Sequence, residues 1–340
     1  MEKQNKILVI GDIHLKENLG YSQYVKDGRA SEKQEILDFI VEQSTDCNTV
    51  VFMGDQLNGR NNPSDVIREL VEFIERFNGK KIFIISGNHE KSGDGKTAID
   101  FLKEINNKDW TIITNEIKKV GDLTFCPYFN KSELGVKTDL SATKKIMEQL
   151  EKNDMLFVHH AVSGTTTTSG VETTIFHEPI LPKKELEKLF KLVVGSHIHS
   201  PQADGRTIVA GSIFNQEAGE HGKFIWKIGE KLSVEQIPLP GRGIYKFENP
   251  TPEDLVTLRN TNIVKVIMTT KGSKEALEEI RKELEKFDAS LLLEQYPSER
   301  KKMAVADNIL DYDTVKLLEV YSVEKQIDIN KLRAAFALIQ

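Results

Sequence analysis

The sequence has only two cysteines, no long apolar run and no excess of positive charge. Cys47 and Cys126 give no framework of paired cysteines, so we expect a reducing, cytoplasmic location. Both thiols are expected to pack as small buried hydrophobes. No apolar stretch approaches the roughly 20 residues of a membrane span, and the N-terminal residues have no signal-peptide pattern. Disulfide-rich secreted proteins and membrane proteins are therefore not expected.

The charge balance gives no direct indication of a nucleic-acid partner. The chain has 46 basic and 52 acidic residues, a net charge of -6, whereas nucleic-acid-binding domains usually carry a basic face. Cations bound in a cleft can nevertheless cancel local carboxylates, so this balance does not exclude such a partner. Four lysine pairs, of which Lys144-Lys145 and Lys183-Lys184 are two, read as solvated surface rather than as a basic patch.

Polar residues of the kinds that bind metals follow five short apolar runs. The stretches are Gly11-Asp12-Ile13-His14, Gly54-Asp55, Gly87-Asn88-His89-Glu90, His159-His160 and Gly195-Ser196-His197-Ile198-His199. Six of the eight histidines fall within them. If the apolar runs are neighbouring strands, their ends bring potential ligands to one edge of the fold, where open α/β sheets place their sites. The seven candidates are Asp12, His14, Asp55, Asn88, His159, His197 and His199.

The candidates offer oxygen and imidazole nitrogen but no thiolate. Mixed ligands of this kind suit Mn²⁺, Fe²⁺ or Zn²⁺, whereas an all-oxygen site would indicate Mg²⁺ or Ca²⁺. Strand alternation would turn Asp12 and His14 the same way, and likewise His197 and His199. Seven ligands exceed what one catalytic metal needs but fit two metals that share the carboxylate of Asp55.

Two metals about 3.5–4 Å apart can hold a deprotonated water and clamp a phosphoryl oxygen, as phosphoester hydrolysis requires. His89 would then stabilise developing charge or protonate the leaving oxygen. For His160 we expect buried packing rather than ligation, and for His177 and His221 ordinary surface or loop positions.

The first ninety residues show a β-α-β-α-β pattern, typical of a largely parallel sheet covered by helices. Ser31 and Gln34 form a capping-box signature, and a second helix is expected from about Ser64. Further expectations are a hairpin around Gly121-Asp122, a helix from Asp139 or Ser141 to about 150, and strands over 207–210, 222–228 and 232–237 that close a second, more antiparallel sheet. The segment 163–176 reads as a flexible loop, or alternatively as a loop that faces a substrate.

Pro238-Leu239-Pro240-Gly241 marks the expected domain boundary. We predict a core domain over 1–240, a small α+β capping domain over 241–305 and a helical tail over 306–340. Within the second domain, Pro252 opens a short helix, Ser273 caps a helix to about 287, and 263–268 and 291–293 are strands. The tail must pack on the body or on a partner chain.

The order Asp-x-His, Gly-Asp, Gly-Asn-His-Glu, His and Gly-Ser-His-Ile-His resembles the calcineurin-like metallophosphoesterase superfamily over residues 6–228. Within it the chain most resembles the SbcD-type DNA double-strand-break-repair nucleases, including phage recombination-endonuclease subunits. Gly11 to Leu15, Gly211-Ser212 and Gly222-Lys223-Phe224 carry this closer likeness, together with the small domain and tail after the core. The resemblance implies an α/β two-sheet sandwich with α-β-β-α layers, a capping domain and a helical tail.

By position, the resemblance implies one Mn²⁺ held by Asp12, His14, Asp55 and His199, and another held by Asp55, Asn88, His159 and His197. His89 would assist the transition state, and Asn58 and Arg60 are candidate substrate contacts. Mg²⁺, Fe²⁺ and Zn²⁺ stay as alternative metals. The chain departs from the family pattern at Asn58, where Asp or His is common, at Glu90 in place of Asp, and at the inserted Ser196.

The implied activity is 3′–5′ exonuclease on duplex DNA ends and single-strand endonuclease. The implied partners are a second copy of the chain, joined near residues 64–77, and an SbcC-like ABC-type coiled-coil ATPase that binds the tail over 310–339. An alternative is a cytoplasmic phosphodiesterase or phosphatase acting on nucleotides or phosphoproteins. A non-enzymatic scaffold with a degenerate site is disfavoured, because the ligand set is complete.

Overall fold

The computed structural model describes residues 6–25, 28–105, 107–168, 170, 172–173, 178–248, 251–255, 263–268, 278–280, 282 and 290–295. Backbone contacts divide the chain into one unit of residues 1–267 and 273–294 and another of 268–272 and 295–340. The expected helical tail over 306–340 lies outside the described residues. The domain limits at 241, 305 and 306 therefore stay predictions.

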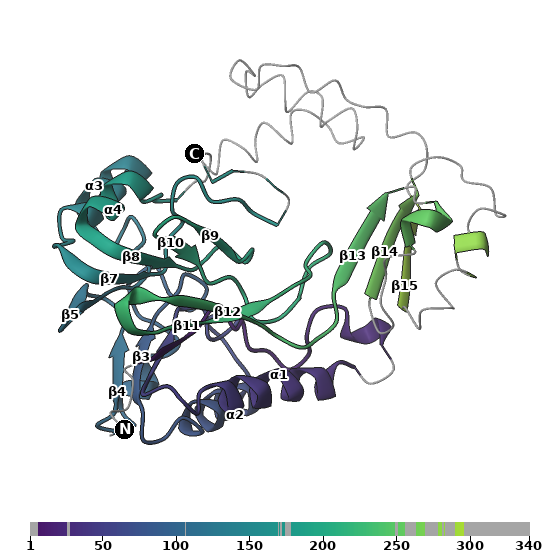
Figure 1. The fold of residues 1–340 in the computed structure, drawn as a ribbon, viewed down its shortest axis with the longest axis horizontal. Helices are drawn as coiled ribbons and strands as arrows, with labels where there is room; N and C mark the ends of the chain where they lie inside the picture. The colour runs from purple at the N-terminus through teal and green to yellow at the C-terminus, as the bar shows by residue number, and fades with distance from the viewer. Residues whose placement is uncertain are drawn as a thin grey trace, which may run out of the picture. The chain divides into compact units, whose positions relative to one another are not determined.

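Two six-stranded sheets form the body of the first unit (Figure 1). The first sheet has the order β12 (Val234–Pro238), β11 (Phe224–Ile228), β1 (Ile7–Ile10), β2 (Thr49–Phe52), β3 (Lys81–Ile85) and β4 (Trp110–Ile113). The second has the order β5 (Lys118–Val120), β6 (Leu123–Cys126), β7 (Asn153–Val158), β8 (Phe190–Gly195), β10 (Thr207–Val209) and β9 (Gln202–Asp204). Strands β1 to β4 are parallel, and so are β6, β7, β8 and β10. The hairpin expected around Gly121 is the antiparallel pair β5–β6.

Helices cover the outer face of each sheet. They are α1 (Ala30–Gln43) and α2 (Ser64–Glu75) on the first sheet, and α3 (Asp139–Met147) and α4 (Lys183–Leu189) on the second. Successive side chains of a strand point to opposite faces, so Leu8 and Ile10 pack under the helices while Ile7 and Val9 face the other sheet. Phe83, Phe125 and others fill that inner layer. The predicted α-β-β-α sandwich is confirmed.

The prediction that strands over 207–210, 222–228 and 232–237 close a second, more antiparallel sheet is wrong in one respect. Strands β11 and β12 close the first sheet, since β11 pairs antiparallel with β1 and places Ile228 opposite Ile7. Only β10 of the three predicted strands lies in the second sheet, parallel to β8. Alternating apolar residues identify a strand, but they do not specify which strand lies beside it.

The expected capping box at Ser31 is also wrong. Helix α1 begins at Ala30 after Arg29, whose φ of 59° is left-handed and whose side chain makes no capping hydrogen bond. In contrast, α2 begins at Ser64 as predicted, and Thr138 caps α3 by accepting a hydrogen bond from Ser141 N. Four short 3₁₀ helices complete the described helices: η1 (Ser22–Tyr24), η2 (Asp100–Lys103), η3 (Glu230–Leu232) and η4 (Pro252–Leu255), the last starting at the predicted proline.

A smaller three-stranded sheet follows the two large ones, in the order β13 (Ile244–Glu248), β14 (Ile263–Met268) and β15 (Ser290–Gln295). It confirms the strands predicted over 263–268 and 291–293, and β13 pairs parallel with β14. The start of β13 is fixed by two hydrogen bonds of 2.7 Å, from Gly219 N to Ile244 O and from Ile244 N to Glu220 O. Of the helix predicted over 273–287, residues 278–280 and 282 are described, and they are helical.

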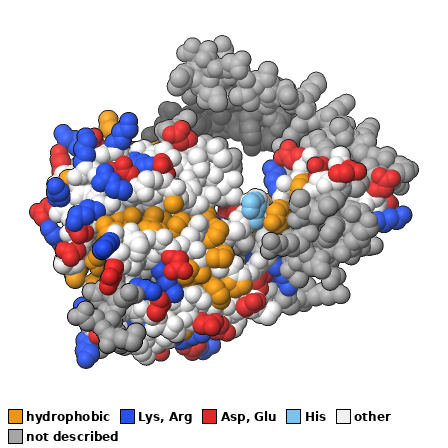
Figure 2. Space-filling model, in the orientation of Figure 1, with side chains coloured by type: hydrophobic (Ala, Val, Ile, Leu, Met, Phe, Trp, Pro, Cys, Tyr) orange, Lys and Arg blue, Asp and Glu red, His pale blue; other side chains and the backbone are white. Residues whose placement is uncertain are grey.

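Cys47 and Cys126 are both free and buried, as predicted, and burial raises the pKa of the Cys47 thiol to about 11. The lysine pairs on α3 and α4 do not form a basic patch, because Lys144 lies near Glu148 and Lys183 is paired with Asp204. Figure 2 shows acidic and basic side chains interspersed on this part of the surface. Among the helices that the structure describes, none is long and apolar enough to cross a bilayer.

Candidate metal centre

The seven predicted ligands converge, but from two sheets rather than from one edge. Asp12, Asp55 and Asn88 follow β1, β2 and β3 of the first sheet, whereas His159 and the His197–His199 pair follow β7 and β8 of the second. Parallel strands within each sheet end at the same edge, and stacking the two sheets brings the two edges together.

The expected strand alternation is not what turns the ligands inward. His14, Asp55 and His197 have φ values of 47°, 49° and 82°, which belong to the left-handed region and not to a strand. Non-glycine residues in this region are uncommon and cluster at functional sites. The turns after the strands therefore set the direction of these side chains.

The first group of converging side chains is Asp12, His14 and His199, whose nearest ligand atoms all lie within 4.8 Å of one another. His14 Nε2 lies 2.9 Å from His199 Nε2. The Oδ2 atom of Asp12 lies 3.8 Å from His199 Nε2 and 4.0 Å from His14 Nε2. This oxygen is buried and has no hydrogen-bond partner among the described residues.

The second group is Asp55, His159 and His197, joined by the amide of Asn88. Asn88 Oδ1 lies 3.2 Å from His159 Nε2 and 2.8 Å from His197 Nδ1. His159 Nδ1 donates to Met53 O at 2.7 Å, which leaves its Nε2 lone pair directed at these acceptor oxygens. Several acceptor atoms thus face one another, an arrangement that requires a proton or a cation between them.

Asp55 lies between the two groups. Its Oδ2 atom is 3.6 Å from His14 Nε2 and 3.4 Å from His159 Nε2, and its Oδ1 accepts a hydrogen bond from His89 N at 2.9 Å. The side chain is almost completely buried. A carboxylate in this position is suited to bridge two cations, with one group of nitrogens on each side.

The site holds negative charge that burial alone would disfavour. Burial would raise the pKa of Asp55, but His159 and His14 outweigh it and hold that pKa below its usual value. Burial lowers the pKa of His14 to about 4, against the attraction of Asp55 and Asp12, so its imidazole is neutral and able to act as a ligand. For His159, Asp55 and Asp12 outweigh burial and raise the pKa to about 9. A divalent cation would take over the charge compensation that a proton on His159 otherwise provides.

These observations fit a pair of divalent cations. The donors are carboxylate, amide and imidazole groups, the set that suits Mn²⁺, Fe²⁺ or Zn²⁺. The unpartnered Asp12 Oδ2 and the two facing Nε2 atoms of His14 and His199 would hold a cation on one side of Asp55. The Asn88 oxygen and the Nε2 of His159 would hold a cation on the other side.

Two glycines and one buried glutamate hold the loops that carry the ligands. At Gly54, whose φ is 106°, a Cβ atom would overlap the ring of His159, and at Gly87 it would overlap Asp55. Glu90 accepts hydrogen bonds of 3.0 Å from Leu57 N and from Gly87 N, so one carboxylate joins the loop after β2 to the loop after β3. Glu90 belongs to the Gly87-Asn88-His89-Glu90 motif, but the sequence alone did not predict that it joins the two loops.

His89 is exposed and lies next to the first group. Its ring packs edge-on to that of His14 with 4.6 Å between centroids, and its Nδ1 lies 3.3 Å from Asn58 O. The candidate substrate contacts Asn58 and Arg60 are both exposed on the same loop. His160 is buried and its Nε2 accepts a hydrogen bond from Phe129 N at 3.1 Å, which is the packing role expected for it. His221 is exposed, as expected, whereas His177 lies outside the described residues.

Three residues near the ligands were missed by sequence reasoning as contributors to the site. The hydroxyl of Ser196 donates to Asp12 Oδ1, so this inserted residue fixes the carboxylate. Glu178 Oε1 lies 2.7 Å from His197 Nε2, and Glu220 Oε1 lies 3.7 Å from His199 Nδ1. Glu220 also pairs with Lys223 three residues later, a spacing that would have been a usable signal. Glu178 follows a Thr- and Ser-rich loop and has no comparable signal.

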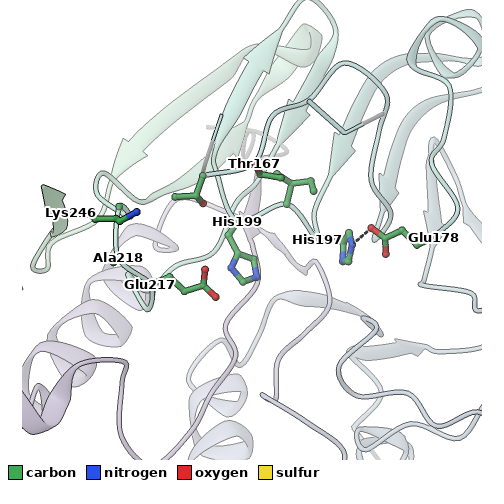
Figure 3. Close-up of a pocket in the computed structure, with 10 residues that line it drawn as sticks. Thr167, Glu178, His197, His199, Glu217, Ala218 and Lys246 are labelled. Atoms are coloured by element: carbon green, nitrogen blue, oxygen red, sulfur yellow. Dashed lines mark hydrogen bonds and ion pairs between the residues drawn. The ribbon is translucent and has the colours of Figure 1, made fainter. Parts of the chain in front are cut away.

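A cavity of about 650 Å³ opens beside His197 and His199 (Figure 3). Its lining includes Thr167, Thr168, Glu178, Glu217, Ala218, Gly219 and Lys246. Thr167 and Thr168 belong to the segment 163–176, so the structure favours the second interpretation of that segment, as a loop that faces a substrate. The cavity gives a ligand direct access to the two histidines.

Comparison with known proteins agrees with this geometry. The sequence profile of the calcineurin-like phosphoesterase family matches residues 5–201, which include all seven converging side chains. No protein of curated function matches the sequence. Because the matched segment is more than half of the 340 residues, the chain belongs to the calcineurin-like phosphoesterase family.

Proposed function

We propose that this protein is a two-metal phosphodiester hydrolase that cleaves DNA, the nuclease subunit of an SbcCD-like repair or recombination complex. The observation that carries the proposal is the position of Asp55 between two sets of nitrogen and oxygen donors, 3.6 Å from His14 Nε2 and 3.4 Å from His159 Nε2. Membership of the phosphoesterase family supports hydrolysis of a phosphoester. The nuclease role rests further on the order of the motifs and on the small sheet that follows the core.

Asp12, His14, Asp55 and His199 would hold one cation, and Asp55, Asn88, His159 and His197 the other; Mn²⁺ is the proposed ion. When bound, two such cations supply charge that polarises a phosphoryl oxygen and lowers the pKa of a water molecule. The chain contributes the positions of these groups, which burial and the surrounding hydrogen bonds hold fixed before substrate arrives.

The position of His89 suits it to donate a proton to the leaving oxygen. It is exposed at the mouth of the site, while its backbone N–H is fixed to Asp55 Oδ1 and its Nδ1 lies 3.3 Å from Asn58 O. With Nδ1–H donating to this carbonyl, a further proton on Nε2 makes the ring an imidazolium, which would give that proton to the leaving oxygen or stabilise its charge. Asn58 and Arg60, on the same exposed loop, are proposed substrate contacts.

The proposed activity is 3′–5′ exonuclease on duplex ends together with single-strand endonuclease, in the cytoplasm. The proposed partners are a second copy of the chain and an ABC-type coiled-coil ATPase bound through the tail over 310–339. Deletion of residues 310–340 should abolish co-purification with the ATPase and leave cleavage of a small chromogenic phosphodiester intact. Loss of both would contradict the docking role and make the tail a part of the fold.

The test of the nuclease proposal is a cleavage assay on blunt and hairpin DNA duplexes with Mn²⁺ or with chelator, with and without the ATPase. The wild-type protein should cleave DNA ends only with Mn²⁺, and Asp55→Asn should not cleave them. Asp122→Asn is a matched control, because this aspartate is exposed in the turn between β5 and β6, outside the site and outside the proposed dimer region. Absence of cleavage by the wild type under every condition would contradict the proposal.

One observation favours the alternative, a phosphodiesterase or phosphatase acting on small nucleotides or phosphoproteins. Two carboxylates, Glu178 and Glu217, line the cavity, and Lys246 is the only lysine or arginine among its described lining residues, so this surface is less favourable to a polyanion than a basic groove. Rapid hydrolysis of small nucleotides with DNA left untouched would support this alternative and overturn the nuclease assignment.

A further inference from the structure

The two ring nitrogens of His197 have different surroundings. Nδ1 faces the candidate metal centre, 2.8 Å from Asn88 Oδ1, whereas Nε2 faces away from it, 2.7 Å from Glu178 Oε1. Both oxygens are acceptors, so without a cation each contact requires a proton on the nitrogen that it faces. With a cation on the Asn88 side of Asp55, Glu178 would accept the hydrogen bond from Nε2–H and leave the lone pair of Nδ1 for the cation.

The backbone does not hold His197 in place by regular structure. The residue lies beyond the end of β8 with a φ of 82°, and its N–H makes a long hydrogen bond of 3.4 Å to Asp12 Oδ1. The rings of His159 and Tyr128 lie beside that of His197, with centroids 5.4 and 6.0 Å away, so these neighbours and the contacts of its two nitrogens together restrict its rotation. The side chains of His197 and Glu178 are 14% and 18% exposed, so water competes little for this contact.

The loop that carries Glu178 is anchored on both sides of its tip. Gln202 of β9 accepts a hydrogen bond from Thr166 N at 2.9 Å and donates one to Thr166 O at 2.6 Å. Ser163 N donates to Leu181 O at 2.9 Å, which joins the two ends of the loop. The same loop lines the cavity through Thr167 and Thr168. Glu178 also lines this cavity, and its carboxylate is directed at His197 (Figure 3).

His159 and His199, which follow β7 and β8, also have an oxygen atom near the ring nitrogen that faces away from the candidate metal centre. His159 has Met53 O against its Nδ1 at 2.7 Å, and His199 has Glu220 Oε1 3.7 Å from its Nδ1. Partners of this kind on the outward nitrogen orient a metal-binding imidazole and raise its basicity. Glu178 differs from Met53 and Glu220 because it lines the cavity itself.

We propose that Glu178 is a positioning residue of the metal centre, which fixes the tautomer and orientation of His197 and so sets cation affinity on the Asn88 side of Asp55. This inference rests on the proposed two-metal function. Removing the contact should weaken one of two cation sites about 10- to 100-fold, the range found when such a partner of a ligand is lost. The other site, formed by Asp12, His14 and His199, should keep its affinity.

The experiment is titration of the full chain with Mn²⁺ by calorimetry and by electron paramagnetic resonance, for wild type, Glu178→Ala, Glu178→Gln and Glu172→Gln. Glu172 is the matched control, because it lies in the same loop and its side chain is exposed. Correlation spectra of ¹⁵N-labelled histidine report the tautomer of His197. Thermal unfolding in chelator shows whether each variant is folded.

Wild type and Glu172→Gln should bind two Mn²⁺ alike, with His197 protonated on Nε2. Glu178→Ala should lose affinity at one site and lose the single tautomer, and Glu178→Gln, which keeps an acceptor oxygen, should fall between. Equal affinities in wild type and Glu178→Ala, with two ions still bound, would overturn this inference and leave the proposed function standing. Failure of the wild type itself to bind two ions would overturn the proposed function.

Discussion

The imidazole rings of His14 and His199, which are 185 residues apart in the chain, face each other with 2.9 Å between their Nε2 atoms. Two neutral nitrogens at this distance repel unless a proton or a cation lies between them, and the unpartnered Asp12 Oδ2 points to the same place. Burial lowers the pKa of His14 to about 4, so its ring accepts at this contact, and the proton between the two nitrogens comes from His199, whose pKa Glu220 and Asp12 raise against burial. Two imidazole nitrogens and a carboxylate oxygen at this spacing would fit a cation that takes the place of that proton.

Metal removal should destabilise the protein. Cations that bind only the folded state stabilise it by about 2.7 kcal/mol at a concentration 100 times the Kd. We expect the Tm to rise with Mn²⁺ concentration and to fall when chelator is added. His14→Ala should reduce this increase, and His221→Ala, an exposed histidine outside the site, should not. A Tm that is the same with Mn²⁺ and with chelator would contradict the fit of cations to these residues.

Gly54→Ala should disturb the site more than an ordinary glycine substitution. The added Cβ overlaps the ring of His159, and the φ of 106° is itself unfavourable for alanine. Gly79→Ala is the control, since its φ of 81° is also left-handed but nothing lies within 4 Å of the new Cβ. In urea denaturation, Gly79→Ala should lower the free energy of unfolding by about 1 kcal/mol through backbone strain. Gly54→Ala should lower it clearly more. Equal losses of unfolding free energy in the two variants would show that His159 moves aside freely, and would contradict this prediction.

Glu90→Gln should loosen the two loops that carry Asp55 and Asn88. The carboxylate accepts from both Leu57 N and Gly87 N, whereas the amide of glutamine turns an NH₂ group toward one of these donors. One backbone N–H is then left without an acceptor in a buried position, which costs about 1–3 kcal/mol. Urea denaturation in chelator measures this loss, and Mn²⁺ affinity should fall with it. Glu116→Gln, exposed between β4 and β5, is the control and should change neither quantity.

Lys223→Met should destabilise the core near His199. Lys223 Nζ is buried and donates to Glu220 Oε1 at 2.9 Å and to Ser212 Oγ at 2.7 Å. Removing one partner of a buried ion pair costs about 3–5 kcal/mol, because the other charge stays buried. Lys227→Met is the comparison, since its partner Asp46 is 44% exposed and the loss should not exceed about 1 kcal/mol. Equal free energies of unfolding for the two variants would contradict the buried pair.

The same pair should give an acid-dependent stability. Burial opposes ionisation of Glu220, but His199, Lys223 and backbone donors outweigh it and lower its pKa from 4.5 to about 2. The unfolded chain then binds the proton first as pH falls. The stabilisation by Glu220 is thus complete above about pH 4.5 and is lost as pH falls toward about 2. Denaturation of wild type and Glu220→Gln across this range should show their difference shrink; a constant difference would contradict the low pKa.

The sequence predicted most of the site because each candidate ligand directly follows a buried strand. Four apolar residues at Ile7–Ile10 specify a strand that is buried on both faces, and parallel neighbours end at one edge. Family membership and the sandwich followed from the order of these motifs. The assignment of individual residues to the two cations stays a prediction, because it depends on an ion and not on the fold.

The features that were missed depend on contacts between distant parts of the chain. The sheet to which β11 belongs is decided by its pairing with β1, more than 200 residues earlier, and no local pattern encodes that choice. The left-handed φ of His197 has no signal in a residue that is neither glycine nor asparagine. Glu178 contacts His197, which is 19 residues away in the chain, and no local pattern encodes that contact.

The most direct measurement is anomalous diffraction at the manganese edge from crystals soaked in Mn²⁺. Two peaks are predicted on either side of the Asp55 carboxylate, one contacting Asp12, His14 and His199 and the other contacting Asn88, His159 and His197. A map with no peak among these residues, or with peaks only elsewhere on the protein, would contradict the two-metal centre and the hydrolase function built on it.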